Sequence, residues 1–159
     1  MAKYITVISD SHGARRNLSR LVGDCSISDK IVFLGDGLSD LDELFEFQDK
    51  IIAVSGNCDF LASYPKQVVF EVEGVKFLAV HGDLYGVKLG LSRLRAYAKS
   101  IGVNAVLFGH THKAMAVEED GVWFINPGTL SHYGDRETFA FVTIKNAKIT
   151  AKIIPVSTR

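Results

Sequence analysis

Five apolar, strand-like stretches in this 159-residue chain each end in a short loop that carries polar side chains. The stretches are YITVIS, KIVFL, IIAVS, KFLAV and NAVLF. The loops that follow them are Asp10-Ser11-His12, Gly35-Asp36, Gly56-Asn57-Cys58-Asp59, His81-Gly82 and Gly109-His110-Thr111-His112. Strands that end at one edge of a sheet deliver their following loops to one place. The pattern therefore predicts that these five loops meet in space.

The side chains that would meet there are typical metal ligands. They are two carboxylates, four imidazoles and one amide, namely Asp10, His12, Asp36, Asn57, His81, His110 and His112. Such donors suit Mn, Fe, Zn, Ni or Mg ions. Seven ligands are too many for one four-coordinate ion, and they suit two ions that share a carboxylate, as in enzymes of phosphoryl chemistry. Each residue alone is more often a core, surface or capping residue, so the prediction depends on the joint pattern.

The order D-x-H, G-D, G-N-x-D, H-G and G-H-x-H resembles the signature of the calcineurin-like metallophosphoesterases. The resemblance runs from Lys3 to about Phe141. The short chain, Cys58 in the third motif and the segment Asn126-Pro127-Gly128-Thr129 are similar to the small prokaryotic phosphodiesterase branch of that family. The resemblance implies an α/β fold, specifically a four-layer α/β/β/α sandwich of two mixed β-sheets flanked by helices, with the motif loops along one edge.

The resemblance also implies how the ligands are divided between two metal ions. One ion would be held by Asp10, His12, Asp36 and His112. The other would be held by Asp36, Asn57, His81 and His110. Asp36 would bridge the two ions together with a water or hydroxide. We expect Mn²⁺ first, with Ni²⁺, Zn²⁺, Fe²⁺ and Mg²⁺ as alternatives.

The implied activity is that of a metal-dependent phosphodiesterase acting on a small phosphoester. A hydroxide bridging the two ions would attack phosphorus in line with the leaving oxygen. The residues expected to take part in catalysis are Asp36, Asn57, Cys58 and His81. Asn57 and Arg136 are expected to contact the substrate, since Arg is suited to phosphate recognition. Because ligating imidazoles must be neutral, metal binding should weaken as the pH falls.

The chain departs from the commoner family pattern at Cys58. Many members have His at this position, where it is thought to protonate the leaving group. A free thiol titrates near ~8.5, which matches proton transfer at neutral pH less well than imidazole does. Two interpretations stay open, either a small buried residue packing beneath the site or a participant in proton transfer.

Two other classes of function remain as alternatives. Some proteins of this fold are non-catalytic scaffolds, including a retromer subunit, but a scaffold has no need of seven intact ligands. A phosphomonoesterase or protein phosphatase is the third interpretation. Cys58 argues against it, and a chain this short leaves little room for a groove that binds a protein substrate.

Composition places the chain among compact soluble proteins. Residues 1–159 are expected to form a single domain, with a hydrophobic share of 47%. Since 18 basic residues balance 18 acidic ones, no net charge recruits nucleic acid. Cys25 and Cys58 form no CxxC pair, which favours the cytoplasm. No apolar run suits a signal segment or membrane span, and assembly into a homo-oligomer is compatible with the sequence.

The periodicity predicts strand–helix alternation followed by hairpins, which favours mixed sheets. The expected strands cover 3–9, 30–34, 51–54, 67–72, 75–80, 104–108, 114–118, 121–125, 138–144 and 148–154. The expected helices cover 14–23, 38–47 and 88–101. The second helix should face inward through Leu41, Leu44 and Phe45. Glu73-Gly74 and Asp120-Gly121 are hairpin turn signals.

Several residues outside the seven have weaker signals. Asp59 is either a turn residue or orients a neighbouring ligand. Asp40 and Asp42 are expected to be solvated or to lie at a helix N-terminus. The turn after Asn126 should lie near the site, where Thr129, Ser131, His132 or Arg136 could reach substrate. His132 lies outside the motifs and is not counted among the metal ligands.

Overall fold

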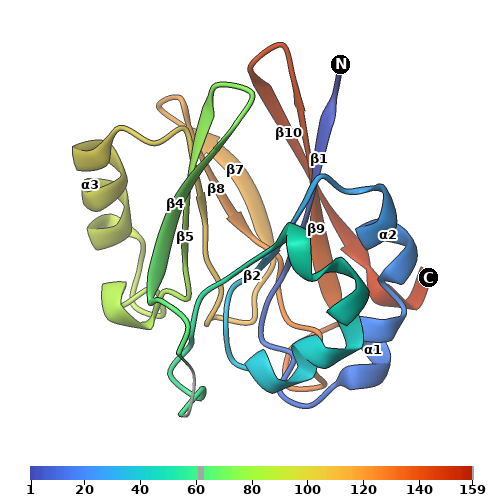
Figure 1. Cartoon of the computed structure of the whole chain (residues 1–159). Helices are drawn as coiled ribbons and strands as arrows, with labels where there is room; N and C mark the ends of the chain where they lie inside the picture. Colours follow the sequence, from blue (N-terminus) through green and yellow to red (C-terminus); the bar gives the residue numbers. More distant parts are fainter. Residues whose placement is uncertain (61–62, 159) are drawn as a thin grey trace.

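The computed structural model describes residues 1–60 and 63–158 and contains two five-stranded sheets packed face to face (Figure 1). The first sheet has the order β10-β9-β1-β2-β3, formed by Lys148–Pro155, Thr138–Lys145, Lys3–Ile8, Lys30–Phe33 and Ile51–Ala53. The second has the order β4-β5-β6-β8-β7, formed by Gln67–Val72, Val75–Val80, Ala105–Leu107, Val122–Asn126 and Met115–Glu119. Each sheet combines parallel and antiparallel pairs, so both are mixed as expected.

Helices cover both outer faces of the sandwich (Figure 1). On the first sheet lie α1 (Arg15–Ser19), α2 (Val22–Ile27) and the 3₁₀ segment η1 (Leu38–Lys50). The second sheet is flanked by η2 (Asp83–Tyr85) and α3 (Ser92–Ile101), and η3 (Val156–Thr158) ends the described chain. The four-layer α/β/β/α prediction is confirmed. No helix among the described residues has the length and apolar character needed to cross a membrane.

Three apolar clusters hold the layers together. The first lies between the sheets and includes Val7, Phe77 and Val142. The second lies under α1, α2 and η1, and the third lies under α3. Because the strands contribute to clusters on both faces, their sequences read as nearly continuous apolar runs. These runs are the strand-like stretches that precede the motif loops.

The predicted helices differ from the structure in part, and the one expected at 88–101 is α3, which begins only at Ser92. The helix expected at 14–23 is two short helices, α1 and α2, and α2 continues to Ile27. The helix expected at 38–47 is a run of 3₁₀ turns that extends to Lys50 and is kinked by non-helical backbone at Leu44 and Phe47. Leu41 and Leu44, three residues apart in a segment with about three residues per turn, are both buried. Phe45 is rotated outward and is 67% exposed, which corrects its predicted inward position.

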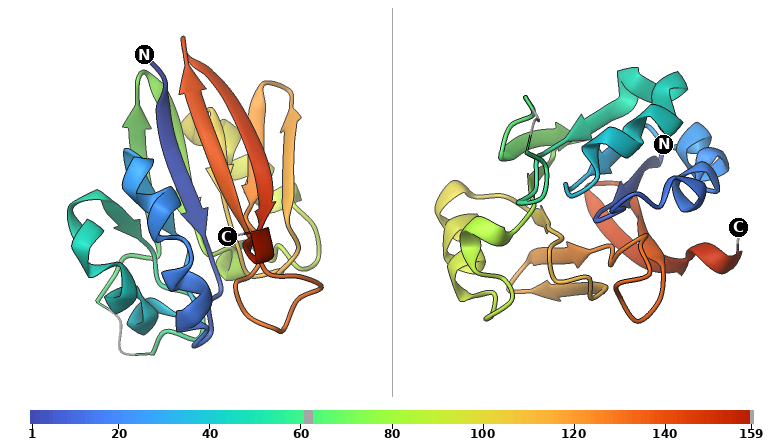
Figure 2. Two further views of the ribbon diagram at one scale, coloured as in Figure 1. Left: turned by 90° about the vertical axis from the view of Figure 1, so that its right-hand side faces the viewer. Right: turned by 90° about the horizontal axis from the view of Figure 1, so that it is seen from below.

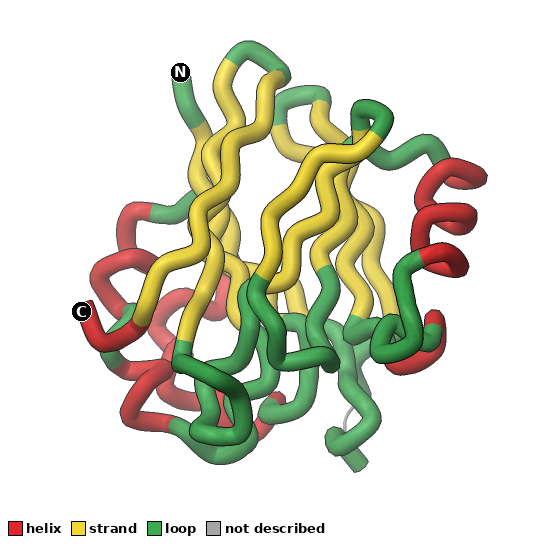
Figure 3. Tube along the Cα trace, turned by 180° about the vertical axis from the view of Figure 1, so that it is seen from behind, coloured by secondary structure: helices red, strands yellow, loops and turns green. Residues whose placement is uncertain are grey.

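The predicted hairpins are confirmed, and their turns explain why. Glu73 and Gly74 connect β4 and β5 with φ angles of 51° and 81°. Asp120 and Gly121 connect β7 and β8 with φ angles of 50° and 80°. Two consecutive residues with positive φ form the turn that matches the twist of paired strands. These turns lie at the edge of the sandwich opposite the motif loops (Figure 3).

The motif loops gather at one edge of the sandwich, which faces the viewer in the right-hand panel of Figure 2. Strands β1, β2 and β3 run parallel in the first sheet, and β5 and β6 run parallel in the second, so within each sheet the carboxyl ends lie at the same edge. Backbone bonds then join neighbouring loops. The Asp10 amide donates to the Gly35 carbonyl at 2.9 Å, and the Gly109 amide donates to the His81 carbonyl at 2.9 Å.

Candidate metal centre

The first group of donors consists of Asp10, His12 and His112. The distance from His112 Nε2 to Asp10 Oδ1 is 3.1 Å, and His12 Nε2 lies 3.5 Å from the same oxygen. The two imidazole nitrogens are 3.3 Å apart. Asp10 and His12 follow β1, whereas His112 follows β6, so this group joins the two sheets.

The second group is centred on Nε2 of His81. Asn57 Oδ1 lies 3.0 Å from this nitrogen, and His110 Nδ1 lies 3.1 Å from it. Asp36 Oδ2 is also close, at 3.2 Å. The same Asp36 oxygen lies 3.8 Å from His12 Nε2 in the first group. Asp36 therefore faces both groups, which is the position expected of a shared carboxylate.

The donor set fits divalent cations. Two donors bound to one cation at about 2.1 Å lie about 3.0–3.4 Å apart, which matches most of the distances within each group. Nδ1 of His81 donates its hydrogen to the Leu34 carbonyl at 2.7 Å, so Nε2 of the neutral ring is an acceptor. Acceptor atoms of Asn57 and Asp36 nevertheless crowd this nitrogen. Lone pairs directed at one point require a positive charge between them.

Protons supply part of that charge in the metal-free site. Burial alone would lower the pKa of His81, but the Asp36 carboxylate overcomes this effect and raises the pKa above its ordinary value. The hydrogen bond to Asp10 likewise raises the pKa of His12. Burial opposes ionisation of Asp10, yet hydrogen bonds from His112 and His12 hold its pKa well below the usual range. Burial also opposes ionisation of Asp36, but the contact with His81 lowers its pKa, so both carboxylates are anionic at neutral pH and attract cations.

Burial and the positive charge of His81 instead lower the pKa of His110. His110 is thus held in the neutral form that binds metals.

Five of the seven donors have a left-handed backbone. Their φ angles lie between 43° and 72°, at Asp10, His12, Asp36, His110 and His112. This conformation is uncommon for residues with a side chain and costs of order 1–3 kcal/mol at each position. The surrounding structure must therefore hold these loops in place.

Asp59 holds the Asp36 loop. Its carboxylate accepts hydrogen bonds from the backbone amides of Asp36 and Gly56, at 2.7 and 2.8 Å. It also accepts from the amides of Gly37 and Leu38, at 3.0 and 3.1 Å. The side chain is thus more than a local turn residue, because it ties the loop after β3 to the loop after β2.

Buried residues around Asp10 and around the histidine loop, which is the segment Gly109-His110-Thr111-His112, form a second support. Ser9 donates to the Asp10 carboxylate, and the Thr129 hydroxyl donates to the Asp10 carbonyl at 2.6 Å. The Asn126 amide donates to the Gly109 carbonyl at 3.2 Å and to the Thr111 hydroxyl at 3.0 Å. Thr129 and Asn126 are fully buried, so they hold the loops rather than lie open to a substrate.

Asp40 is a residue whose role sequence reasoning missed. It lies in the first turn of η1, as one of the two expectations had it, but its side chain is buried rather than solvated. Its carboxylate accepts from the Ser11 hydroxyl at 2.6 Å and from the Gly13 amide at 2.8 Å. It therefore fixes the loop that carries His12. An Asp at a helix start gives no sequence signal that distinguishes this role.

Cys58 lies beside both groups of donors and is exposed. Its thiol belongs to a cluster with His12 and Asp36 whose candidate ligand atoms all lie within 4.8 Å of one another. The backbone amide of Cys58 donates to Asp36 Oδ1 at 2.8 Å. Burial and the Asp36 charge raise the pKa of the thiol, so it keeps its proton at neutral pH. The expectation of a buried packing residue at this position is wrong.

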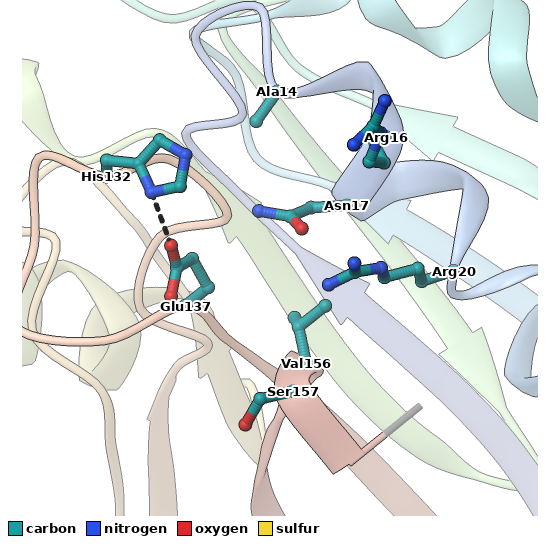
Figure 4. Close-up of a pocket in the computed structure, with 8 residues that line it drawn as sticks. All are labelled: Ala14, Arg16, Asn17, Arg20, His132, Glu137, Val156 and Ser157. Carbon is teal, nitrogen blue, oxygen red and sulfur yellow. Dashed lines mark ion pairs between the residues drawn. The ribbon is translucent and has the colours of Figure 1, made fainter.

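Arg136 and His132 lie outside the donor cluster. Arg136 is exposed and lines a pocket that also includes His112. His132 lines a different pocket, with Arg16 and Arg20, and its Nδ1 pairs with Glu137 at 2.6 Å (Figure 4). No residue lining this pocket is one of the seven donors.

Comparison with known proteins identifies the family of the chain. Residues 4–147 match the family model described as the calcineurin-like phosphoesterase superfamily domain. The chain therefore belongs to the calcineurin-like phosphoesterase superfamily, a class of metal-binding hydrolases, as its motifs implied.

Individual relatives span most of the chain. It is 29% identical over 151 residues to the probable metallophosphoesterase YsnB of Bacillus subtilis, covering 93% of this chain and 88% of YsnB. It is 24% identical over 174 residues to the phosphodiesterase YfcE of Escherichia coli, covering 96% and 83%. A solved structure from Streptococcus pneumoniae, a predicted phosphoesterase, superimposes with a TM-score of 0.84 at 27% identity, covering 99% of this chain and 91% of that one.

Proposed function

We propose that this protein is a divalent-metal-dependent phosphodiesterase that hydrolyses a small phosphoester. The observation that carries the proposal is the convergence of acceptor atoms on His81 Nε2, with Asp36 shared between both groups of donors. Membership of the phosphoesterase superfamily supports the reaction class.

The proposed ligands of one ion are Asp10, His12, Asp36 and His112, and those of the other are Asp36, Asn57, His81 and His110. Mn²⁺ is the proposed ion, since carboxylate and imidazole donors in a partly open site suit it. When bound, two divalent ions supply Lewis-acid charge and lower the pKa of a water molecule toward neutrality, which is the chemistry that phosphoester hydrolysis requires.

The chain's own residues have three further tasks. Asp36 supplies the negative charge that both ion sites share, and His81 is kept in its ligand tautomer by the Leu34 carbonyl. Cys58 holds a proton on Sγ beside Asp36, where a leaving oxygen could receive it. Arg136, which lines a pocket together with His112, is proposed to bind a phosphate oxygen.

Two observations favour a diester over a monoester. The thiol of Cys58 stands where many family members carry an imidazole, and a thiol with a raised pKa is the weaker proton donor. A diester with a good leaving group needs that donor least. The relative YfcE is named a phosphodiesterase, which supports the same choice.

A substrate panel tests the proposal. Protein stripped with a chelator and reloaded with Mn²⁺ should hydrolyse bis(p-nitrophenyl) phosphate faster than p-nitrophenyl phosphate or a phosphoserine peptide. Faster hydrolysis of the monoester or the peptide would favour a phosphomonoesterase or protein phosphatase. Full metal loading without hydrolysis of any ester would favour a non-catalytic scaffold.

A further inference from the structure

We propose that a pocket beside Cys58 receives a planar, uncharged aromatic group of the substrate, so that the substrate is an aryl or nucleoside phosphoester. This inference rests on the proposed function and specifies its substrate class. The pocket has a volume of about 470 Å³ and is lined by Leu38, Ser39, Cys58, Asp59, Phe60, Ser63 and Tyr64. A volume of this size lies within the range of small-molecule sites.

The pocket is continuous with the metal centre through two residues. The Cys58 thiol lines the pocket and also lies within 4.8 Å of candidate ligand atoms on His12 and Asp36. Asp59 lines the pocket and accepts hydrogen bonds from the Asp36 loop. A group attached to phosphorus at the metal centre would therefore lie next to the pocket.

The lining selects an apolar, flat group. Phe60 is 87% exposed and Tyr64 is 47% exposed, so two aromatic rings are in contact with water at the mouth of the site. Aromatic rings offer stacking surfaces to planar groups. The described residues that line the pocket include no Lys, Arg or His. The carboxylate of Asp59 is engaged by backbone amides and is the only carboxylate among the described lining residues, so the pocket does not attract anions.

A second pocket makes the site asymmetric. It also has a volume of about 470 Å³, and it is lined by Thr111, the residue between the proposed ligands His110 and His112 in the sequence. Lys88 and Lys113 line it, and its described lining includes no carboxylate. An anionic part of a substrate is therefore attracted toward the histidine loop, whereas an aromatic part is left to the pocket beside Cys58.

Binding of phosphonates to the Mn²⁺-loaded protein tests the pocket without requiring hydrolysis. Isothermal titration should show phenylphosphonate binding about 10-fold more tightly than methylphosphonate, since stacking on an aromatic side chain commonly contributes this much. The Phe60→Ala/Tyr64→Ala double variant should bind the two equally and keep the wild-type affinity for methylphosphonate. Phe45→Ala removes an equally large exposed ring that does not line the pocket, and it should keep the 10-fold preference.

A second pair of ligands distinguishes a nucleobase from a simple aryl ring. Uridine 5′-monophosphate should bind more tightly than ribose 5-phosphate if the pocket accepts a base, and this preference should also disappear in the double variant. A preference for phenylphosphonate alone would restrict the substrate to aryl esters.

Equal binding of phenyl- and methylphosphonate by the wild type, or an unchanged preference in the double variant, would overturn the inference. The proposed function fails separately. If phenylphosphonate is preferred but no diester is hydrolysed, the pocket stands and the phosphodiesterase proposal is wrong. If diesters are hydrolysed and the preference is absent, only the pocket assignment is wrong. Thermal melting of each variant should match the wild type, because the replaced rings are exposed.

Discussion

At the scale of single residues, Cys58 is the position where the chemistry of this site is most open to experiment. Its thiol is exposed, protonated at neutral pH and close to Asp36, but a thiol with a raised pKa is a weaker proton donor than an imidazole. Proton donation matters most when the leaving oxygen is basic. A nitrophenolate leaves without a proton, whereas the alkoxide of a ribose or a serine does not.

We therefore expect Cys58→His to raise hydrolysis of alkyl esters more than hydrolysis of nitrophenyl diesters. A well-placed general acid contributes roughly 10²–10⁴-fold, and a grafted imidazole should recover part of this. Cys58→Ala should change nitrophenyl diester hydrolysis little. The measurement is the ratio of alkyl-ester to nitrophenyl-ester turnover in the three proteins at equal metal content. The same ratio in all three would mean that this position takes no part in leaving-group protonation.

Asp59 is a positioning residue, and its variant separates support from ligation. In Asp59→Asn one oxygen becomes an NH₂ group that faces backbone amides, so hydrogen bonds to the Asp36 loop are replaced by repulsion. We expect Mn²⁺ affinity to fall about 10–100-fold, as for other residues that orient metal ligands. Calorimetric titration measures this affinity. Asp42→Asn alters an exposed carboxylate and should bind Mn²⁺ like the wild type.

At the scale of secondary-structure elements, glycines allow the motif loops to approach one another. A Cβ on Gly56 would lie 2.1 Å from Asp36 Oδ1 and 2.7 Å from the Asp36 backbone nitrogen. Both distances are far shorter than any van der Waals contact. The loops after β2 and β3 can therefore share the metal centre only if position 56 has no side chain.

Gly56→Ala should consequently destabilise the fold by about 1–3 kcal/mol and impair Mn²⁺ binding. Gly23→Ala is the matched control, because a Cβ there meets nothing within 4 Å and α2 is helical. The control should be neutral or more stable by about 0.5–1 kcal/mol. Urea unfolding of both variants measures the difference. Wild-type stability in Gly56→Ala would show that the two loops are farther apart than described.

The elements also show what sequence could and could not predict. Hairpins such as that at Asp120-Gly121 were predictable because a local turn signal is sufficient to form them. The 3₁₀ geometry of η1 was not, because its choice over an α-helix depends on how Leu41 and Leu44 pack on the sheet. The hydrophobic periodicity of residues 14–23 likewise does not predict that they divide into two helices.

In the candidate site, too, features set by local sequence were predictable and features set by long-range packing were not. The seven donors could be predicted because each follows an apolar strand. The supporting contacts could not, since Thr129 reaches Asp10 across 119 positions and Asp40 reaches Ser11 across 29. Such long-range contacts depend on the packing of complete layers rather than on local pattern. The exposure of Cys58 depends on the conformation of the loop around it, which local pattern does not specify.

At the scale of the whole molecule, metal binding and protonation compete for the same site. In the metal-free protein the folded-state pKa values of His12 and His81 are raised. Their protonation therefore stabilises the fold below the unfolded pKa of about 6.5, and this contribution is lost as the pH rises through the folded values. The lowered pKa of His110 acts in the opposite direction. Metal ions bind the neutral rings, so their stabilising effect increases with pH.

We predict that the melting temperature of the metal-free protein falls between pH 6 and pH 8. The reason is that two histidines with a raised pKa outweigh one histidine with a lowered pKa. The increase in melting temperature caused by a fixed Mn²⁺ concentration should grow over the same interval. Each proton displaced changes the binding free energy by about 1.4 kcal/mol per pH unit. Differential scanning calorimetry at several pH values checks both trends. If the rise in melting temperature caused by Mn²⁺ is the same at every pH, histidines are not the ligands.

The whole account depends on the two groups of donors acting together on bound ions. The most direct measurement is a Mn²⁺ titration of protein shown by elemental analysis to be metal-free, with bis(p-nitrophenyl) phosphate hydrolysis recorded at each step. We predict no hydrolysis above the blank without metal, and a rise that reaches its plateau at about two equivalents per chain. A hydrolysis rate that is already at its maximum in the metal-free protein, and that Mn²⁺ does not change, would contradict the account.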